Sequence, residues 1–289
     1  MPIIRIDDAA DPRIADYRNV PDPELLRRRG LFVAENRLVV RVLLGSARFR
    51  TLSVLVTDAA YAALGNELAP HAQTLPVYIC AKSLMESICG YPLHRGCLAL
   101  GMRPDPPSVS DLLTTLGLAS DASERSGAMG PRHSNIVVLE GISNADNVGA
   151  VFRNARAFGV DGVVVGPGCC DPLYRKAIRV SIGAALEVPY ASVGPPGFVT
   201  DLLTLKRAGF MLVALTPAAD AVDLDSFAAG PRPERVALVV GNEGEGLSAD
   251  ALRASDVRVR IAMAPGVDSL NVSTATGIAL HRLWDRKSE

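Results

Sequence analysis

Three stretches of the chain place hydroxyl, amide and carboxylate side chains directly after apolar runs. They are residues 135–154, 236–248 and 261–283 of the 289-residue sequence. Polar groups beside a buried strand must be satisfied within the protein or presented to a ligand. If the apolar runs are parallel strands, their carboxyl ends meet at one edge of a sheet, where such sheets bind ligands. We therefore expect the three stretches to form one site.

Each polar residue in these stretches also has a purely structural interpretation. Glu243 lies among glycines and is either an exposed turn carboxylate or the holder of a donor from another loop, with Arg153 as the candidate donor. Asn147 is expected to cap the helix that follows it, and Ser269 or Asn271 could cap the final helix. Arg153 lies off the apolar stripe of its helix, as a solvated residue would.

The sequence lacks the patterns of a nucleotide-hydrolysing or metal site. A dinucleotide-binding turn needs G-x-G-x-x-G, and residues 166–168 (Gly-Pro-Gly) lack the third glycine. The 244–246 turn (Gly-Glu-Gly) lacks the lysine of a phosphate-binding loop, and its carboxylate would repel phosphates. The five cysteines and four histidines are scattered without metal-ligand spacing. We therefore expect no metal site, and free thiols in a reducing compartment.

Composition and charge narrow the class of protein. Hydrophobic residues make up 48% of the chain, enough to bury sizeable cores, and the length suggests two domains. The net charge of −1 argues against a protein that coats nucleic acid through overall basicity, although local basic patches stay possible. The first residues lack the apolar core of a signal peptide, and no apolar run is long enough to span a membrane. We predict a cytoplasmic protein with no membrane partner.

Hydrophobic periodicity divides the chain into four parts. Residues 1–22 are a polar, proline-bearing arm, and residues 105–133 are a linker rich in Gly, Ser, Pro and charge. Residues 23–104 alternate strand and helix patterns, as in a small α/β domain. Residues 134–289 carry continuous apolar strands, typical of a parallel sheet covered on both faces. In this last part strands are expected at 136–140, 162–166, 187–190, 210–216, 236–241 and 257–261, and helices at 148–158, 172–185, 198–208, 249–255 and 271–286.

Arginine dominates the basic residues of the first domain. Arg is favoured where a phosphate is bound by two parallel hydrogen bonds. A solvated face explains a run of charge equally well, so both interpretations stay open. The candidate phosphate-binding residues are Arg27, Arg28, Arg29, Arg37, Arg41 and, on the first helix of the second domain, Arg156.

Taken together, the three polar loops resemble those of the SpoU (TrmH-like) family of SPOUT methyltransferases. These enzymes transfer a methyl group from S-adenosylmethionine to a ribose 2′-hydroxyl of RNA. The matching residues are Asn147-Val-Gly-Ala-Val-Phe-Arg153-Asn154, residues 239–248 (VVGNEGEGLS) and residues 261–277. Gly30-Leu-Phe-Val-Ala-Glu35 and His94-Arg95-Gly96 are similar to the family's amino-terminal domain, which resembles ribosomal protein L30e. Asn36 and Arg95 stand where the family often has glycine and glutamine.

The resemblance implies a fold and a partner that composition does not suggest. The expected fold is a SPOUT-type parallel sheet with a carboxyl-terminal trefoil knot, preceded by a small L30e-like α/β domain that binds the RNA substrate. The boundaries of these two domains are 134–289 and 23–104. The family also forms homodimers through the catalytic domain, so we expect one here. The RNA, ribosomal or transfer, would contact the arginines named above.

The resemblance also implies roles for individual residues. It assigns cofactor binding to Thr216, Gly241, Ile261 and Leu270, and catalysis to Asn147, Arg153, Glu243, Ser269 and Asn271. A guanidinium stays protonated, so Arg153 is a poor literal base. We expect it to contact the RNA phosphate and to act electrostatically on the developing alkoxide, oriented by Glu243. Asn147, Ser269 and Asn271 would shape the ribose site.

Three other functions compete with this one. A SPOUT enzyme could methylate an RNA base, although the Ser-Leu-Asn-Val-Ser run at 269–273 favours ribose. An RNA-binding or ribosome-assembly protein could have lost turnover, but all five expected polar positions are filled. A plain dinucleotide-binding enzyme is disfavoured because its glycine fingerprint is missing.

Overall fold

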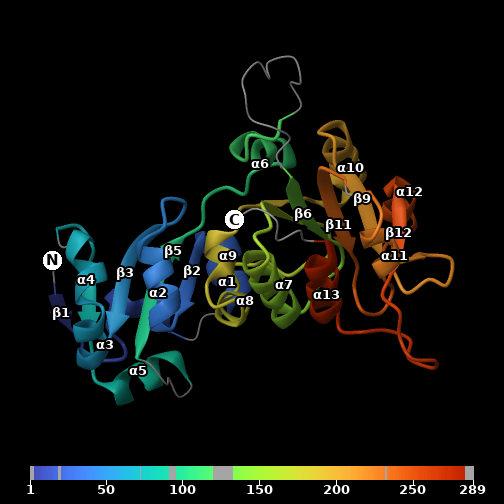
Figure 1. The fold of residues 1–289 in the computed structure, drawn as a ribbon. Helices are drawn as coiled ribbons and strands as arrows, with labels where there is room; N and C mark the ends of the chain where they lie inside the picture. Colours follow the sequence, from blue (N-terminus) through green and yellow to red (C-terminus); the bar gives the residue numbers. More distant parts are fainter. Residues whose placement is uncertain are drawn as a thin grey trace. The chain divides into compact units, whose positions relative to one another are not determined.

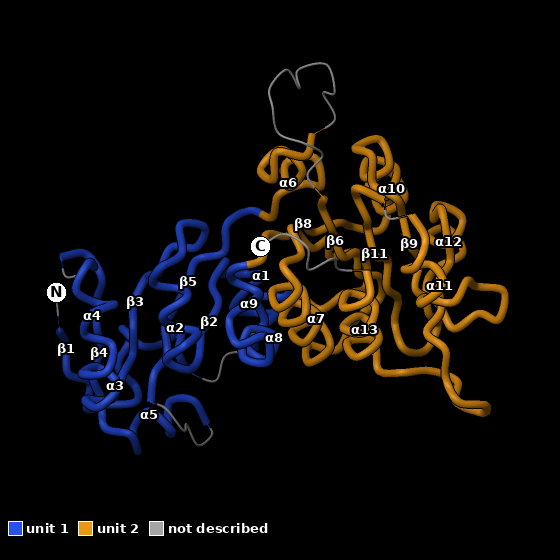
Figure 2. Tube along the Cα trace, in the orientation of Figure 1, with its two compact units in different colours: residues 1–105, 172–187 blue, residues 106–171, 188–289 orange. Residues whose placement is uncertain are grey.

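The chain forms two compact units. The computed structural model describes residues 3–18, 21–71, 73–90, 96–119, 133–231 and 233–283. One unit contains residues 1–105 and 172–187, and the other contains residues 106–171 and 188–289 (Figure 2). His94 and Arg95 of the L30e-like motif lie outside the described residues.

The first unit is built on a mixed sheet. Its described strands are β1 (Ile3–Arg5), β2 (Leu31–Glu35), β3 (Arg50–Val56), β4 (Val77–Ile79) and β5 (Cys97–Met102). They lie in the order β1–β4–β3–β5–β2, and β5 is antiparallel to both of its neighbours (Figure 1). The helices before residue 105 are α1 (Asp22–Arg29), α2 (Arg37–Leu44), α3 (Asp58–Ala63), α4 (Gly65–Leu68) and α5 (Lys82–Cys89). The alternation of strands and helices predicted from the sequence is confirmed.

The amino-terminal segment is part of this fold, where an extended arm was expected. β1 adds a parallel strand to the edge of the sheet beside β4. The following 3-10 helix, Pro12–Tyr17, buries Ile14 and Tyr17 completely. The Tyr17 hydroxyl lies 2.8 Å from the Ser53 Oγ, so its polar end is satisfied inside the core. Ile14 and Tyr17 stand among charged residues in a single short helix, which gives too few repeats of a pattern for this docking to be predicted.

Residues 172–187 pack with the first unit, although the sequence prediction included them in the 134–289 domain (Figure 2). They form two short helices, α8 (Arg175–Val180) and α9 (Ala184–Glu187), where one helix was expected. Ile182 and Gly183 have positive φ angles of 52° and 87°, which ends the first helix. α8 contacts β2, and the backbone N–H of Arg175 donates to the Asp22 carboxylate at 2.9 Å.

Part of the predicted linker is also folded. α6 (Val109–Thr115) is capped by Ser108, which forms a reciprocal capping box with Asp111. Val109 and Leu112 of this helix are buried in the core of the second unit. Apolar residues at helical spacing therefore outweigh the surrounding proline-rich composition. Residues 120–132 of the predicted linker lie outside the described part of the chain.

All seven strands described in the second unit run parallel. They lie in the order β10–β12–β9–β11–β6–β7–β8, of which Figure 1 labels β12, β9, β11 and β6. Their bounds are β6 (Ser134–Leu139), β7 (Gly162–Val165), β8 (Tyr190–Ser192), β9 (Met211–Leu215), β10 (Val222–Asp223), β11 (Arg235–Val240) and β12 (Val257–Arg260). The predicted parallel sheet is confirmed. The two-residue strand β10 carries no pattern that a sequence could reveal.

Two groups of helices cover this sheet. α7 (Ala145–Ala157) packs against α13 (Val272–Leu283), which also contacts α11 (Leu224–Ala228). α10 (Phe198–Arg207) packs against α6 and α12 (Ala249–Ala254). Alternate strand residues such as Ile136 and Val138 join the second group in one apolar cluster. Among the described residues, no helix combines the length and the apolar character needed to cross a membrane.

The strand order creates a switch point between β6 and β11. After β6 the chain passes through α7 to β7 on one side, and after β11 it passes through α12 to β12 on the other. Neighbouring strands whose connections leave in opposite directions open a crevice at their carboxyl ends. All three polar loops predicted to form the site lie at this edge of the sheet.

Candidate functional site

The loops that follow β9, β11 and β12 enclose a cavity of about 340 Å³, here called the β9–β12 cavity. The four residues predicted to bind the cofactor all line it: Thr216, Gly241, Ile261 and Leu270. Leu247 and Met263 add further apolar walls. The structure thus brings these residues together, and their contact with a cofactor stays a prediction.

The Glu243 carboxylate joins three segments that are far apart in the sequence. Its Oε1 atom accepts hydrogen bonds from Asn271 Nδ2 at 2.6 Å, Asn147 Nδ2 at 2.9 Å and the Val272 backbone N at 3.3 Å. Asn271 Nδ2 also donates to Asn147 Oδ1 at 2.9 Å. We call Asn147, Glu243 and Asn271 the amide–carboxylate cluster. Glu243 does hold donors from other loops, as one interpretation of the sequence predicted, but these donors are amides.

Asn147 has a different position from the one predicted. α7 is capped by Asn144, whose Oδ1 accepts from the backbone N–H of Asp146 at 2.8 Å. Asn147 is therefore the third residue of the helix, and the expectation that it is the cap is wrong. The residue is 7% exposed, and its side chain belongs to the amide–carboxylate cluster. The helix begins one turn earlier because Asn144 already satisfies its first N–H groups.

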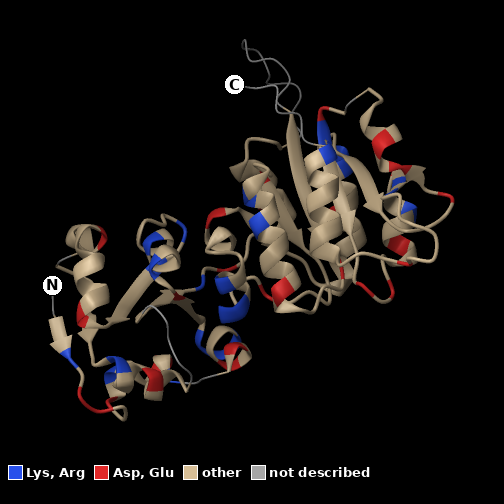
Figure 3. Ribbon diagram, turned by 60° about the horizontal axis from the view of Figure 1, so that its bottom comes forward, with Lys and Arg blue, Asp and Glu red and all other residues tan. Residues whose placement is uncertain are grey.

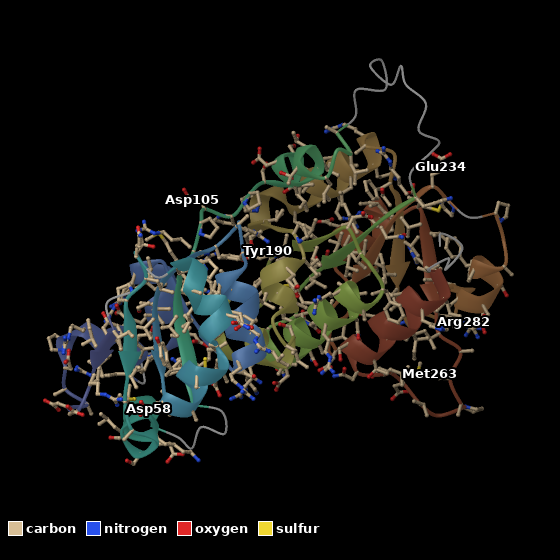
Figure 4. The ribbon with its side chains drawn as sticks, turned by 60° about the vertical axis from the view of Figure 1, so that its left-hand side comes forward. Asp58, Asp105, Tyr190, Glu234, Met263 and Arg282 are labelled. Atoms are coloured by element: carbon tan, nitrogen blue, oxygen red, sulfur yellow. The ribbon has the colours of Figure 1, made fainter. Side chains whose placement is uncertain are left out.

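Asn271 caps the final helix while it binds Glu243. Its Oδ1 accepts from the backbone N–H groups of Ser273 at 3.0 Å and Thr274 at 3.3 Å. The two ends of one amide thus hold the start of α13 and the carboxylate of another loop. Ser269, the other candidate cap, is exposed on the 261–271 loop and lines the β9–β12 cavity. Figure 4 labels Met263 on this loop.

Arg153 makes no bond with the Glu243 carboxylate of its own chain, so its orientation by Glu243 stays a prediction. Its exposed guanidinium makes no hydrogen bond or ion pair with any described residue. It lines a different cavity of about 580 Å³ between α7 and α13, together with Ser273, Gly277 and Ile278. Val272 and Ala275 lie on the β9–β12 side of α13. Residues three or four apart share a helix face, so α13 separates Arg153 from the predicted cofactor residues.

The 241–248 loop is held in shape by two side chains that the sequence prediction missed. Asn242 Oδ1 accepts from the backbone N–H groups of Gly244 and Glu245, both at 2.7 Å. Glu140 Oε2 accepts from the Ser248 backbone N–H at 2.9 Å. The Asn-x-Gly turn signal could have revealed Asn242. No local pattern reveals Glu140, because its partner is 108 residues away.

Two backbone features keep this edge of the sheet compact. A Cβ atom added to Gly241 would overlap the backbone of Gly246, so the loop closes tightly on itself. Cys169 Sγ accepts from the Ile142 backbone N–H at 3.4 Å. Burial raises the pKa of the Cys169 thiol to about 11, so it stays neutral near pH 7 and is no nucleophile.

The predicted phosphate-binding arginines divide into two groups. Arg29 pairs with Asp16 at 2.7 Å and with Glu24 at 3.1 Å, and Arg41 pairs with Glu67 at 2.6 Å. The other three in the first unit have no bonding partner among the described residues: Arg27, Arg28 and Arg37. Arg156 lies exposed on α7. Figure 3 shows acidic residues interspersed with the basic ones.

The described residues contain no group of three or more His, Cys, Asp or Glu side chains that could hold a metal ion. The cysteines are free thiols, and four of the five are buried. The polar side chains at this edge of the sheet include amides, hydroxyls and the carboxylates of Glu140 and Glu243.

Comparison with known proteins gives consistent matches. Residues 134–281 match the model of the SpoU rRNA Methylase family. The chain is 42% identical, over 278 residues, to an uncharacterized tRNA/rRNA methyltransferase of Mycobacterium tuberculosis, covering 95% of this chain and 89% of that protein. An AdoMet-bound rRNA methyltransferase from Sinorhizobium meliloti aligns with a TM-score of 0.77 at 20% identity, covering 97% of both chains. An RNA 2′-O ribose methyltransferase aligns with a TM-score of 0.68 at 26% identity, covering 97% of this chain and 98% of the other.

The amide–carboxylate cluster predicts an effect of one isosteric substitution. Asn147→Asp replaces the buried Nδ2 donor with an oxygen that faces the Glu243 carboxylate. We expect the free energy of unfolding to fall by roughly 1–3 kcal/mol, because the buried side chain at position 147 loses its hydrogen bond to Glu243 and gains a charge that the Glu243 carboxylate repels. Urea unfolding monitored by circular dichroism measures this.

Asn144→Asp is the matched control, three residues earlier on the same helix. It adds the same charge but keeps the oxygen that caps the helix, and Asn and Asp are equivalent caps. Its stability should stay within a few tenths of a kcal/mol of the parent. Equal losses in the two variants would contradict the role given to Asn147.

Proposed function

The chain belongs to the SpoU family of RNA methyltransferases, and on this basis we propose that it transfers a methyl group from S-adenosylmethionine to a ribose 2′-hydroxyl of rRNA or tRNA. The observation that carries the proposal is the amide–carboxylate cluster beside the β9–β12 cavity. Four residues line both this cavity and a neighbouring cavity that Asn147 of the cluster also lines: Asn242, Glu243, Gly244 and Val272. A methyl donor in one cavity and a methyl acceptor in the other would be close neighbours, as methyl transfer requires.

The β9–β12 cavity has the chemistry to hold S-adenosylmethionine. Ile261 and Leu270 offer apolar walls for an adenine ring, and Gly241 lines the same cavity. Thr216 adds a hydroxyl at the end of β9. When bound, the cofactor supplies an electrophilic methyl group on a sulfonium. The AdoMet-bound S. meliloti enzyme and family membership support the same cofactor.

Ribose is favoured over a base as the acceptor. The side chains of the cluster are two amides and one carboxylate, which suit sugar hydroxyls, and none is aromatic. The aligned RNA 2′-O ribose methyltransferase, at 26% identity over nearly the whole chain, supports this choice. In the proposed mechanism Asn147 and Asn271 fix Glu243 beside the ribose, and Ser269 lines the β9–β12 cavity next to it.

Methyl transfer can be tested directly. The purified chain, RNA from cells that lack it and S-adenosylmethionine should yield 2′-O-methylated nucleosides on digestion and mass analysis. Mapping of the modified position then identifies the RNA. Methyl groups on a base would support the base-methylating alternative. Cofactor binding by calorimetry without any transfer would support an RNA-binding protein that has lost turnover.

We propose a homodimer in which Arg153 serves the partner's site. Within one chain α13 separates Arg153 from the β9–β12 cavity. The 580 Å³ cavity beside it carries the small residue Gly277 and the exposed apolar side chain of Ile278, which is 37% exposed. An apolar face with small residues suits close packing of a second copy. Arg153 would contact the RNA phosphate and stabilise the developing alkoxide.

Two measurements test the role of Arg153. Arg153→Lys should lower kcat by about tenfold or more, because Lys cannot make a bidentate contact, and leave cofactor affinity unchanged. Mixing Arg153→Ala chains with Leu270→Asp chains, each inactive alone, should restore about a quarter of the activity through mixed dimers. Near-full activity of Arg153→Lys would contradict the assignment. Absence of restoration, with mixed dimers present, would place Arg153 in its own chain's site.

We also propose the two fold features that the resemblance implies. A trefoil knot is supported by the path of the chain, because after β12 it returns past β9 and β11 to place α13 against α7. Single-molecule stretching measures this, since a knot shortens the extended chain. An L30e-like fold of the first unit is supported by its mixed five-stranded sheet with surrounding helices in the described residues.

The two groups of arginines give a prediction for RNA binding by the first unit. The Arg27→Ala/Arg28→Ala double variant should weaken RNA affinity and reduce the slope of log K against log salt by about two. Arg29→Ala, on the same helix, should change the slope far less because Asp16 and Glu24 already neutralise Arg29. Filter binding at several salt concentrations measures both. Equal slopes in the two variants would assign no RNA contact to Arg27 and Arg28.

A further inference from the structure

A second, smaller cavity lies at the switch point of the parallel sheet. Its volume is about 250 Å³, and it is bordered by the loops that follow β6 and β11. We call it the β6–β11 cavity. Crevices at such switch points are the usual ligand sites of open parallel sheets. Typical small-molecule pockets measure about 300–1,000 Å³, so this one suits a fragment such as a single sugar.

This cavity shares a wall with the β9–β12 cavity. Asn242, Glu243, Gly244 and Val272 line both. Asn147 of the amide–carboxylate cluster lines only the β6–β11 side. A group held in the β6–β11 cavity would therefore lie beside a ligand in the other cavity, where the two cavities meet at these four residues.

Two asparagines present fixed hydrogen-bond donors to the β6–β11 cavity. Asn144 Oδ1 is engaged by the Asp146 N–H, and Asn242 Oδ1 by the N–H groups of Gly244 and Glu245. The opposite end of each amide, Nδ2, makes no bond with the described residues, and neither does the Ser143 hydroxyl. The internal bonds hold these amides in place, so little ordering is needed when a ligand binds.

The lining selects a neutral, hydroxyl-bearing ligand. It contains the Glu243 carboxylate and no Lys or Arg, which disfavours a phosphate. It contains no aromatic side chain, which disfavours a stacked base. Its amides, hydroxyl and carboxylate offer both donors and acceptors to sugar hydroxyls.

From these observations we infer that the β6–β11 cavity binds the ribose of the target nucleotide, with Ser143, Asn144 and Asn242 as positioning residues. This inference rests on the proposed function and deepens it, because it assigns the acceptor sugar to a cavity separate from the cofactor. It also follows that this cavity reads the sugar and leaves the identity of the base to be read elsewhere.

Nuclear magnetic resonance tests the cavity without turnover. Guanosine and uridine, added to the full chain with S-adenosylhomocysteine, should both shift the side-chain amide resonances of Asn144 and Asn242. The 2′-deoxy forms should shift them several-fold less. Equal shifts with ribose and deoxyribose, or no shifts, would overturn the assignment of this cavity. Failure of methyl transfer to every RNA, with the shifts present, would instead overturn the proposed function.

Kinetics tests the positioning role. The Ser143→Ala/Asn144→Ser double variant keeps a helix cap but loses the free amide and hydroxyl donors. We expect the KM for RNA to rise about tenfold, the loss of two neutral hydrogen bonds, with cofactor affinity and thermal stability unchanged. RNA whose target nucleotide is 2′-deoxy has no acceptor hydroxyl, so its binding affinity is measured in place of KM. The double variant and the parent should bind this RNA with equal affinity. Ser226→Ala, an exposed serine on α11, should change nothing. An unchanged KM in the double variant would contradict the role.

Discussion

One carboxylate holds the site together. Glu243 Oε1 accepts donors from the first turn of α7, from the loop before α13 and from the backbone at the start of α13. A carboxylate can accept several hydrogen bonds at once, and bonds to a charged acceptor are stronger than neutral ones. Asn147 and Asn271, which lie 96 and 28 residues from Glu243 along the chain, are thereby fixed at one point. The shapes of both neighbouring cavities depend on it, because Glu243 lines each of them.

The same cluster also fixes the start of α13, whose two faces line different cavities. Asn271 caps α13 with one end of its amide and binds Glu243 with the other, so the helix start and the site form together. Val272 and Ala275 then lie toward the β9–β12 cavity, while Gly277 and Ile278 lie toward the cavity of Arg153. A helix has two faces with different neighbours, and here those faces separate the predicted cofactor residues from the predicted phosphate contact.

The parallel sheet supplies the frame for this arrangement. Parallel strands bring all their carboxyl ends to one edge, and the switch between β6 and β11 opens a crevice there. The first unit is built differently, on a mixed sheet completed by the amino-terminal strand and the buried Tyr17. It also includes α8 and α9 from the middle of the sequence. Its boundary therefore follows packing and not chain order.

Much of this protein follows from its sequence alone. Continuous apolar runs such as Val236–Val240 encode central parallel strands, and the polar loops after them encode the edge at which a site forms. The resemblance of these loops to one family follows from local residues, since each motif is contiguous. Propensity and periodicity act over a few residues, so they determine strands, helices and loop chemistry wherever no distant contact overrides them.

Only the tertiary structure decided which polar groups meet. Glu243 was expected to hold Arg153, yet it binds Asn147 and Asn271, because α13 lies between the two cavities. Asn144 and not Asn147 caps α7, and Glu140 fixes a loop 108 residues away. Val109 and Leu112, which were predicted to lie in the linker, are buried in the core of the second unit. Residues 172–187 pack with the first unit, although the residues on either side of them belong to the second. Hydrogen-bond partners and burial depend on the three-dimensional path of the backbone, which local sequence patterns do not contain.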